Sequence, residues 1–236
     1  MGTPLVQALE NRGHEVVVLA RATGVDLLTG SGLAERLAGI DAVIDVLSTP
    51  TTSRRKAVRF FSTTTANLLA AEQAAGVSHH VALSIVGIDE VPFGYYQGKV
   101  AQEEAVTSGP VPWTILRAPQ FHEFAAQLLD RTSVGPVAIA PKMTSAPMAA
   151  TEVAEQLADL ATGDPQGMAT PLRGPETLPM HDLVKRVSRE LGPRKLVLTV
   201  GMPGAVGRGM TGGALVARDP AVVGTQTFDQ WLETRQ

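Results

Sequence analysis

The chain has 236 residues, of which 44% are hydrophobic and 18% are charged, and it contains no cysteine. This composition is that of a globular protein with ample core material, and the lack of cysteine excludes disulfides, thiolate nucleophiles and Cys-metal sites. A net charge of −3 gives no electrostatic reason to expect binding to nucleic acid. No apolar run approaches the ~20 residues that span a bilayer. We therefore expect a cytoplasmic protein that binds neither nucleic acid nor a membrane.

Helical and strand patterns alternate along the chain, which is typical of a parallel sheet with helices on its faces. In the first half, the patterns predict helices at 3–11, 32–37, 57–75 and 99–107, and strands at 15–20, 42–47, 80–86 and 113–117. Beyond Phe121 the pattern loosens, with helices predicted at 151–161, 181–191 and 227–234 and a strand at 195–200. We therefore expect an α/β protein with a Rossmann-like, doubly wound parallel sheet and a small C-terminal substrate lobe. It would form one domain, with a nucleotide-binding core at 1–125 and mixed core and substrate lobe at 126–236.

The sequence begins at a helix where a fold of this kind begins at a strand. Gly2 stands where the last glycine of a dinucleotide-binding loop would stand, but neither a strand nor a glycine-rich turn precedes it. In the strand order 3-2-1-4-5-6 the first strand is central, so its loss would leave two strands with unpaired edges. We expect about 10–15 residues upstream that hold this strand and turn. Whether the chain binds a nucleotide without them is left open.

A serine, a tyrosine and a lysine are spaced as a catalytic set. Tyr95 and Lys99 stand at positions i and i+4 of a predicted helix and would share one face. A cationic neighbour favours the phenolate of tyrosine, so Tyr95 could exchange a proton with a carbonyl or an alcohol while Lys99 binds a ribose hydroxyl. Ser84 stands at the carboxyl end of a neighbouring strand, the edge at which open α/β sheets bind ligands. The alternative is that Tyr95 is an ordinary half-buried aromatic residue.

The residue at the end of the strand predicted at 15–20 bears on the choice of cofactor. A site specific for NAD usually has an acidic residue there for the ribose 2′-hydroxyl. This chain has Arg21, whose guanidinium suits a 2′-phosphate. NADP(H) is therefore favoured over NAD(H), the alternative being that Arg21 is only a solvated strand end.

Seven segments in order along the chain carry a resemblance to a known family. They are GHEVVVLAR (13–21), GVDLLTG (24–30), DAVIDVLS (41–48), HHVALSIVGID (79–89), YYQGKVAQEEAV (95–106), WTILRAPQFHEF (113–124) and TFDQWL (227–232). The chain resembles the atypical short-chain dehydrogenases/reductases of the NmrA-like, NAD(P)H-binding group over nearly its whole length.

The resemblance implies a Rossmann-type sheet and gives roles to individual residues. Asp26 and Leu27 would lie near the adenine, and Ser48 and Thr49 would line the cofactor channel. Ser84, Tyr95 and Lys99 would form the catalytic set. Further residues would lie beside the nicotinamide and the substrate, namely Pro119, Gln120 and Phe121.

Two functions are consistent with the resemblance. The first is an NADP(H)-dependent oxidoreductase, active as a monomer or homodimer on a small carbonyl, alcohol, quinone or enone. The second is a non-catalytic protein that binds NAD(P) and reports redox state to a partner. The intact set of Ser84, Tyr95 and Lys99 favours the enzyme.

Several other features are weaker candidates. Gly201, Gly204 and Gly207 follow a predicted strand, but the glycines and proline after them make poor helix material, so we expect a loose lobe and not a phosphate loop. His122 follows the fourth predicted strand, so a substrate-facing role is possible. No pair of histidines has metal-ligand spacing, so no metal site is expected. Asp45, inside an apolar strand, needs a partner, and we expect a backbone or Ser/Thr hydrogen bond.

Overall fold

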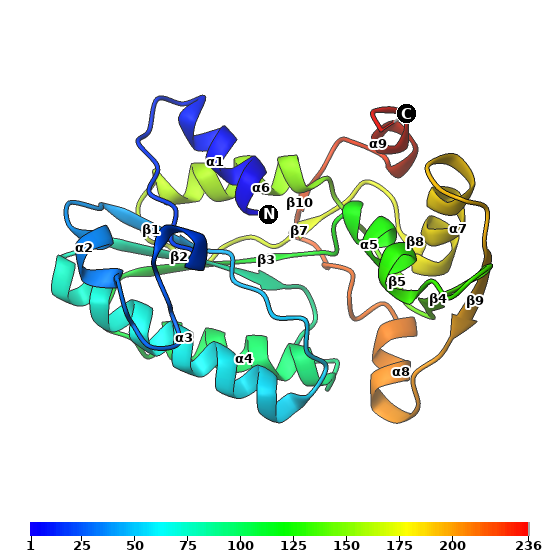
Figure 1. The fold of residues 1–236 in the computed structure, drawn as a ribbon, viewed down its shortest axis with the longest axis horizontal. Coiled ribbons are helices and arrows are strands. Elements are labelled where there is room, and N and C mark those ends of the chain that lie inside the picture. The colour runs from blue at the N-terminus through cyan, green and yellow to red at the C-terminus, as the bar shows by residue number, and fades with distance from the viewer. Residues whose placement is uncertain (236) are drawn as a thin grey trace. The chain divides into compact units, whose positions relative to one another are not determined.

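The structure is a computed structural model that describes residues 1–235, and its elements are labelled in Figure 1. The chain folds as two compact units. The sheet unit comprises Met1–Ser84, Phe93–Arg117 and Ala154–Ala169, and the lobe unit comprises Ile85–Pro92, Ala118–Val153 and Thr170–Gln236. Among the helices of residues 1–235, none is both long enough and apolar enough to cross a membrane.

The sheet unit is built on a four-stranded sheet in the order β1-β2-β3-β6, covered by helices on both faces (Figure 1). The strands are β1 (Ala42–Asp45), β2 (His79–Ile85), β3 (Trp113–Ala118) and β6 (Gly167–Met168). β1 pairs in parallel with β2, and β3 pairs in parallel with β6. The helices are α1 (Gly2–Glu10), α2 (Leu33–Leu37), α3 (Arg54–Ala75), α4 (Gly94–Thr107) and α6 (Ala150–Ala161, of which the residues from Ala154 on belong to this unit), with a 3-10 turn, η1 (Arg21–Thr23). The predicted α/β class with a parallel sheet is confirmed.

The strand predicted at residues 15–20 is wrong. This stretch has no regular secondary structure, and Val18 is 45% exposed. β1 is the last strand on its side of the sheet, and within residues 1–235 the run at 15–20 does not pair with its outer edge. The run is held instead by Thr23, whose hydroxyl lies 2.8 Å from the carbonyl oxygens of both Val18 and Ala20 and donates its one hydrogen to either.

Helices α3 and α4 approach closely because α4 has a glycine at each of two contacts. A Cβ atom on Gly98 would lie 2.7 Å from the Cβ of Ala57 and 2.8 Å from a ring carbon of Phe61. A Cβ on Gly94 would lie 2.1 Å from the carbonyl oxygen of Thr52. The two glycines therefore set the distance between α3 and the first turns of α4.

Gly98→Ala is expected to lower the free energy of unfolding by about 1–3 kcal/mol, the usual cost of adding atoms to a packed contact. Urea denaturation would measure the change. Gly201→Ala is the matched control, because a Cβ at Gly201 meets no atom within 4 Å, and a surface change of this kind shifts stability by less than about 0.5 kcal/mol. Equal losses in the two variants would contradict the close contact.

The lobe unit contains three two-stranded sheets and four helices among the residues described. β4 (Val137–Pro141) and β9 (Leu196–Val200) are parallel, β5 (Thr144–Ser145) and β8 (Leu178–Pro179) are antiparallel, and β7 (Leu172–Arg173) and β10 (Val222–Val223) are parallel. The helices are α5 (Glu123–Thr132), α7 (Met180–Glu190), α8 (Gly204–Thr211) and α9 (Phe228–Glu233). α7 buries one face, formed by Met180, Leu183, Val184 and Val187.

Helix α8 corrects the expectation of poor helix material after residue 200. Two of its glycines are required by close contacts, since a Cβ on Gly207 would lie 1.8 Å from the carbonyl oxygen of Met202 and one on Gly209 would lie 2.8 Å from Val91. Tertiary packing here outweighs the low helix propensity of glycine.

Candidate active site

Tyr95 lies in the first turn of α4, beside the loop that follows β1. Its hydroxyl is 3.0 Å from the hydroxyl of Ser48, close enough for a hydrogen bond that either could donate. Its ring packs edge-on against Phe61 of α3, with centroids 5.7 Å apart. Tyr95 is half-buried, so its hydroxyl is both held in place and open to a ligand.

Lys99 lies one turn further along α4 and is only 2% exposed. Its Nζ donates to the carbonyl oxygen of Leu83 at 2.6 Å and to Oε1 of Gln102, and lies 4.9 Å from the centre of the Phe61 ring. Burial lowers the pKa of Lys99 from 10.5 to about 8, although the charges of Asp45 and Glu103 act in the opposite direction.

The electrostatic effect expected on Tyr95 is wrong. Burial raises the pKa of Tyr95 above its ordinary value of 10.0, the charge of Asp45 raises it further, and only the hydrogen bond with Ser48 lowers it. The ammonium of Lys99 is directed to Leu83 and Gln102. Tyr95 therefore carries its proton at neutral pH, which suits a proton donor.

Ser84 follows Leu83 near the carboxyl end of β2. It is 2% exposed, and its hydroxyl has no hydrogen-bond partner among residues 1–235. A buried hydroxyl without a partner is unfavourable by about 1–3 kcal/mol, so this oxygen suits a bound ligand. Because Lys99 binds the carbonyl of the preceding residue, β2 brings Ser84 to the same region of the sheet unit as Lys99.

The residues expected to bind the nucleotide are spread over the start of the sheet unit. Gly2 is the first residue of α1, and Arg21 is the first residue of η1, not the end of a strand. The guanidinium of Arg21 is exposed and has no partner among the described residues, so it is available to a phosphate. Asp26 caps its own turn by accepting from the backbone N–H of Leu28 at 2.9 Å.

Two further expected positions flank this region. The carbonyl oxygen of Leu27 accepts from the side chain of Asn67 in α3 at 2.9 Å, which ties the turn to that helix. Thr49 is half-buried in the loop that also carries Ser48. The unpartnered hydroxyl of Ser84 and the free guanidinium of Arg21 are the observations that best fit a phosphorylated, hydroxyl-bearing cofactor.

The expected nicotinamide and substrate residues belong to the lobe unit. Pro119 is buried, and Gln120 accepts a hydrogen bond from the hydroxyl of Ser145 through Oε1. Its backbone carbonyl accepts from the N–H of Met148, which also forms a β-bridge with Phe121. These contacts fix the segment after β3 within the lobe unit.

His122, for which the sequence allows a substrate-facing role, is buried in the lobe unit. The side chain is 1% exposed, and its Nε2 lies 3.1 Å from the carbonyl oxygen of Gln226. Its ring packs against Phe228 and Trp231, and burial lowers its pKa below the ordinary value of 6.5. His122 therefore anchors the C-terminal segment.

Sequence reasoning missed Gln102. Asp45 does accept the expected backbone hydrogen bond, from the N–H of Leu47 at 2.9 Å, but its second partner is the side-chain amide of Gln102 at 2.7 Å and not a serine or threonine. The i, i+3 spacing of Lys99 and Gln102 was a signal that could have found this contact.

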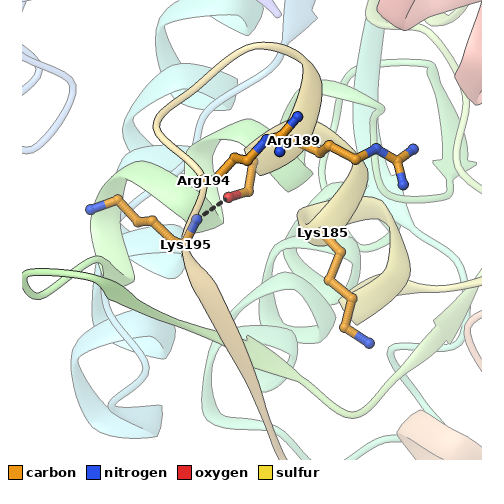
Figure 2. A pocket seen from close by; sticks show the side chains of 5 residues that line it. Lys185, Arg189, Arg194 and Lys195 are labelled. Carbon is orange, nitrogen blue, oxygen red and sulfur yellow. Dashed lines mark hydrogen bonds between the residues drawn. The ribbon is translucent and has the colours of Figure 1, made fainter.

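Basic side chains line a hollow on the lobe unit, and two of them are engaged by other groups of the protein. Figure 2 shows the side chains around it pointing in different directions. Nζ of Lys195 donates to the carbonyl of Gly135, and the guanidinium of Arg189 pairs with Glu190. The lining residues are Lys185, Ser188, Arg189, Arg194 and Lys195. Among the described residues, no group of three or more His, Cys, Asp or Glu side chains is placed to hold a metal ion.

Comparisons with known proteins agree with this fold. The chain is 28% identical over 198 residues to a (4-alkanoyl-5-oxo-2,5-dihydrofuran-3-yl)methyl phosphate reductase of Streptomyces griseus subsp. griseus. The match covers 79% of this chain and 66% of that reductase, just under two thirds of its length.

Two solved structures show the same fold at low identity. An NADPH-dependent quinone oxidoreductase from Escherichia coli, complexed with NADPH, has a TM-score of 0.68 and 17% identity, with 99% of this chain and 95% of that chain covered. A triphenylmethane reductase from Citrobacter sp., complexed with NADP(H), has a TM-score of 0.68 and 16% identity, with 100% and 96% covered. Both support a Rossmann-like sheet.

The sequence also matches the family described as NAD(P)H-binding over residues 17–164, which is more than half of the chain. This range contains the Ser84, Tyr95 and Lys99 set together with most of the sheet. The chain therefore belongs to the NAD(P)H-binding family.

Proposed function

We propose that the protein is an NADP(H)-dependent reductase of a small organic substrate with a carbonyl group or a conjugated double bond. The cofactor supplies a hydride when bound, and the chain supplies the proton that completes the reduction. For a carbonyl, the products are the alcohol and the oxidised cofactor. The observation that carries the proposal is the arrangement of Ser84, Tyr95 and Lys99 within one unit.

Each of the three residues has a distinct part. Tyr95, kept protonated by burial, donates its proton to the substrate oxygen. The unpartnered hydroxyl of Ser84 donates a hydrogen bond to the same oxygen and orients it. Lys99, fixed against β2, binds a ribose hydroxyl of the cofactor.

The preference for NADP(H) rests on Arg21. Its unpaired guanidinium would bind a 2′-phosphate through charge-assisted hydrogen bonds. Solved structures of similar fold include complexes with NADPH or NADP(H) and complexes with NAD, so the preference rests on Arg21 and not on these neighbours. The similar reductase from Streptomyces acts on a phosphorylated, unsaturated furanone, so an unsaturated lactone belongs among the substrates to be tried.

The proposal predicts that NADPH is consumed with at least one member of a panel of quinones, carbonyl compounds and unsaturated lactones. The absorbance of the reduced nicotinamide measures this consumption. NADH should serve less well. Arg21→Ser should lower kcat/KM for NADPH about 10- to 100-fold, the loss of one strong hydrogen bond to a charged group, and leave the value for NADH unchanged.

The outcomes separate the possible functions. Binding of NADPH, measured by titration of its fluorescence, without turnover of any substrate would favour the sensing protein over the enzyme. Absence of binding to either nucleotide would overturn both. Equal effects of Arg21→Ser on the two cofactors would remove the argument for NADP(H).

A further inference from the structure

Behind the candidate catalytic lysine lies a buried chain of hydrogen bonds. Lys99 Nζ donates to Oε1 of Gln102, and Nε2 of Gln102 donates to Oδ2 of Asp45 at 2.7 Å. Oδ1 of Asp45 accepts from the backbone N–H of Leu47 at 2.9 Å. The three side chains, on β1 and α4, are each 1–2% exposed. A buried network of this kind is favourable when every member is paired.

The chemistry of the three groups fixes the direction of the chain. An ionised carboxylate only accepts hydrogen bonds and an ammonium only donates them, whereas a side-chain amide does both. Gln102 must therefore turn its NH2 toward Asp45 and its oxygen toward Lys99. The carboxylate of Asp45 on β1 thus fixes the orientation of the Gln102 amide, so that Lys99 donates to Oε1.

We propose that Asp45 and Gln102 are positioning residues for Lys99, which hold its ammonium against β2 and keep it charged in a buried place. The inference deepens the proposed function and rests on it for the catalytic role of Lys99. The ammonium has three N–H groups, and Leu83 and Gln102 take two of them. The third remains for the hydroxyl of a bound cofactor. Asp45 and Gln102 themselves touch neither the cofactor nor the substrate in this assignment.

Burial and two nearby carboxylates act on the pKa of Lys99 with different strengths. Burial is the largest influence on the pKa of Lys99 and lowers it, and the charge of Asp45 opposes burial more strongly than that of Glu103. Glu103 is in addition paired with Arg117 at 2.7 Å, which offsets its charge. Apart from these carboxylates, Lys99 faces the uncharged ring of Phe61.

Nuclear magnetic resonance of protein with 15N-labelled lysines tests the positioning role without any substrate. The chain has five lysines, and Lys99 is the buried one. Its Nζ signal, assigned by its loss in Lys99→Arg, should titrate with a pKa of about 8. Asp45→Asn should lower the pKa of Lys99 by at least about one unit. The variant removes the charge, and because an amide has one oxygen it can accept from the N–H of Leu47 or from the NH2 of Gln102 but not from both.

Two further variants keep the result decisive. Glu104→Gln makes the same charge change at an exposed position of α4 and should leave the pKa of Lys99 unchanged. Gln102→Met keeps the charge of Asp45 but removes the acceptor, so the pKa of Lys99 should fall by a smaller amount than in Asp45→Asn. This variant also tests the network if Asp45→Asn fails to fold. The proposal would be overturned if the pKa of Lys99 were the same in Asp45→Asn as in Glu104→Gln. If Asp45→Asn does not fold, the same comparison is made between Gln102→Met and Glu104→Gln.

A second readout separates this inference from the proposed function. If NADPH-dependent turnover is found, the alkaline limb of kcat/KM should move to lower pH in Asp45→Asn together with the Lys99 signal. If no substrate is turned over but the Lys99 signal still follows Asp45, the reductase assignment fails and the positioning role stands. If NADPH is turned over but the alkaline limb of kcat/KM lies at the same pH in Asp45→Asn as in the parent protein, the positioning role is refuted and the reductase assignment stands.

Discussion

Tyr95→Phe is expected to lower kcat of NADPH-dependent reduction by about 10²- to 10⁴-fold, the usual contribution of a positioned proton donor. The variant keeps the ring contact with Phe61 and loses only the hydroxyl that pairs with Ser48. Binding of NADPH should change little, so steady-state kinetics with both substrates varied would show the loss in kcat. Thermal unfolding should show a loss of only about 0.5–1.5 kcal/mol for the missing hydrogen bond.

Tyr96→Phe is the matched control for this prediction. It removes a hydroxyl from the next residue of α4, whose ring is 6.2 Å from that of Tyr95, and should leave kcat nearly unchanged because Tyr96 has no part in the proposed proton transfer. Similar losses in both variants would show that the helix, and not the hydroxyl of Tyr95, is responsible. Unchanged turnover in Tyr95→Phe would exclude the proposed proton donor.

The pH profile of the same activity follows from the two shifted groups. Burial raises the pKa of Tyr95 above 10.0, so loss of its proton does not limit reduction near neutral pH. The pKa of Lys99 is lowered to about 8, and its cationic form is lost as the pH rises through that value. The alkaline limb of kcat/KM is therefore expected near pH 8.

His80→Leu is expected to lower the free energy of unfolding by about 3–5 kcal/mol, because removing one partner of a buried ion pair leaves the other charge uncompensated. Nδ1 of His80 in β2 lies 2.9 Å from Oε1 of Glu72 in α3, and both side chains are fully buried. Urea denaturation at pH 6 and pH 8 measures the effect. The double variant Glu72→Leu with His80→Leu should recover most of the loss, since a well-packed apolar pair often matches a buried ion pair.

The contribution of His80 to the free energy of unfolding depends on pH because its pKa is shifted in the folded protein. Burial lowers the pKa of His80, but its hydrogen bond and charge attraction to Glu72, together with Asp45, outweigh burial and raise the pKa above 6.5. A raised folded pKa gives a contribution that is complete below pH 6.5 and is lost as the pH rises through the folded value. The parent protein should therefore lose stability from pH 6.5 upward, and His80→Leu should lose less. A double variant as unstable as the single one would argue against the pair.

Local patterns predicted most of the sheet unit. The apolar run at 42–47, the helix at 57–75 with Gly76 after it and the Tyr95–Lys99 spacing all depend on neighbours in the sequence, and the structure contains β1, α3 and α4 there. The run at 15–20 failed because three adjacent valines indicate a strand without showing whether another strand lies beside it.

The chemistry of the site was less predictable than its elements. The i, i+4 spacing put Tyr95 and Lys99 on one helix, but the direction of the Tyr95 pKa depends on burial and on Asp45, which is 50 residues away in the sequence. The surroundings of His122 were not predictable for a similar reason. Its neighbours Gln226 and Phe228 come from the far end of the chain, and sequence order gives no distance between them.

The carboxylate of Asp45 acts on more than Lys99. It raises the pKa of Tyr95, of His80 and of Glu72 as well, so a single buried charge is shared by the candidate catalytic residues and by the ion pair between α3 and β2. Substitutions that widen the working pH range of such an enzyme would therefore also alter the pH range over which it stays folded. Removal of the Asp45 charge is therefore expected to shift the pH range of activity and the pH dependence of stability together.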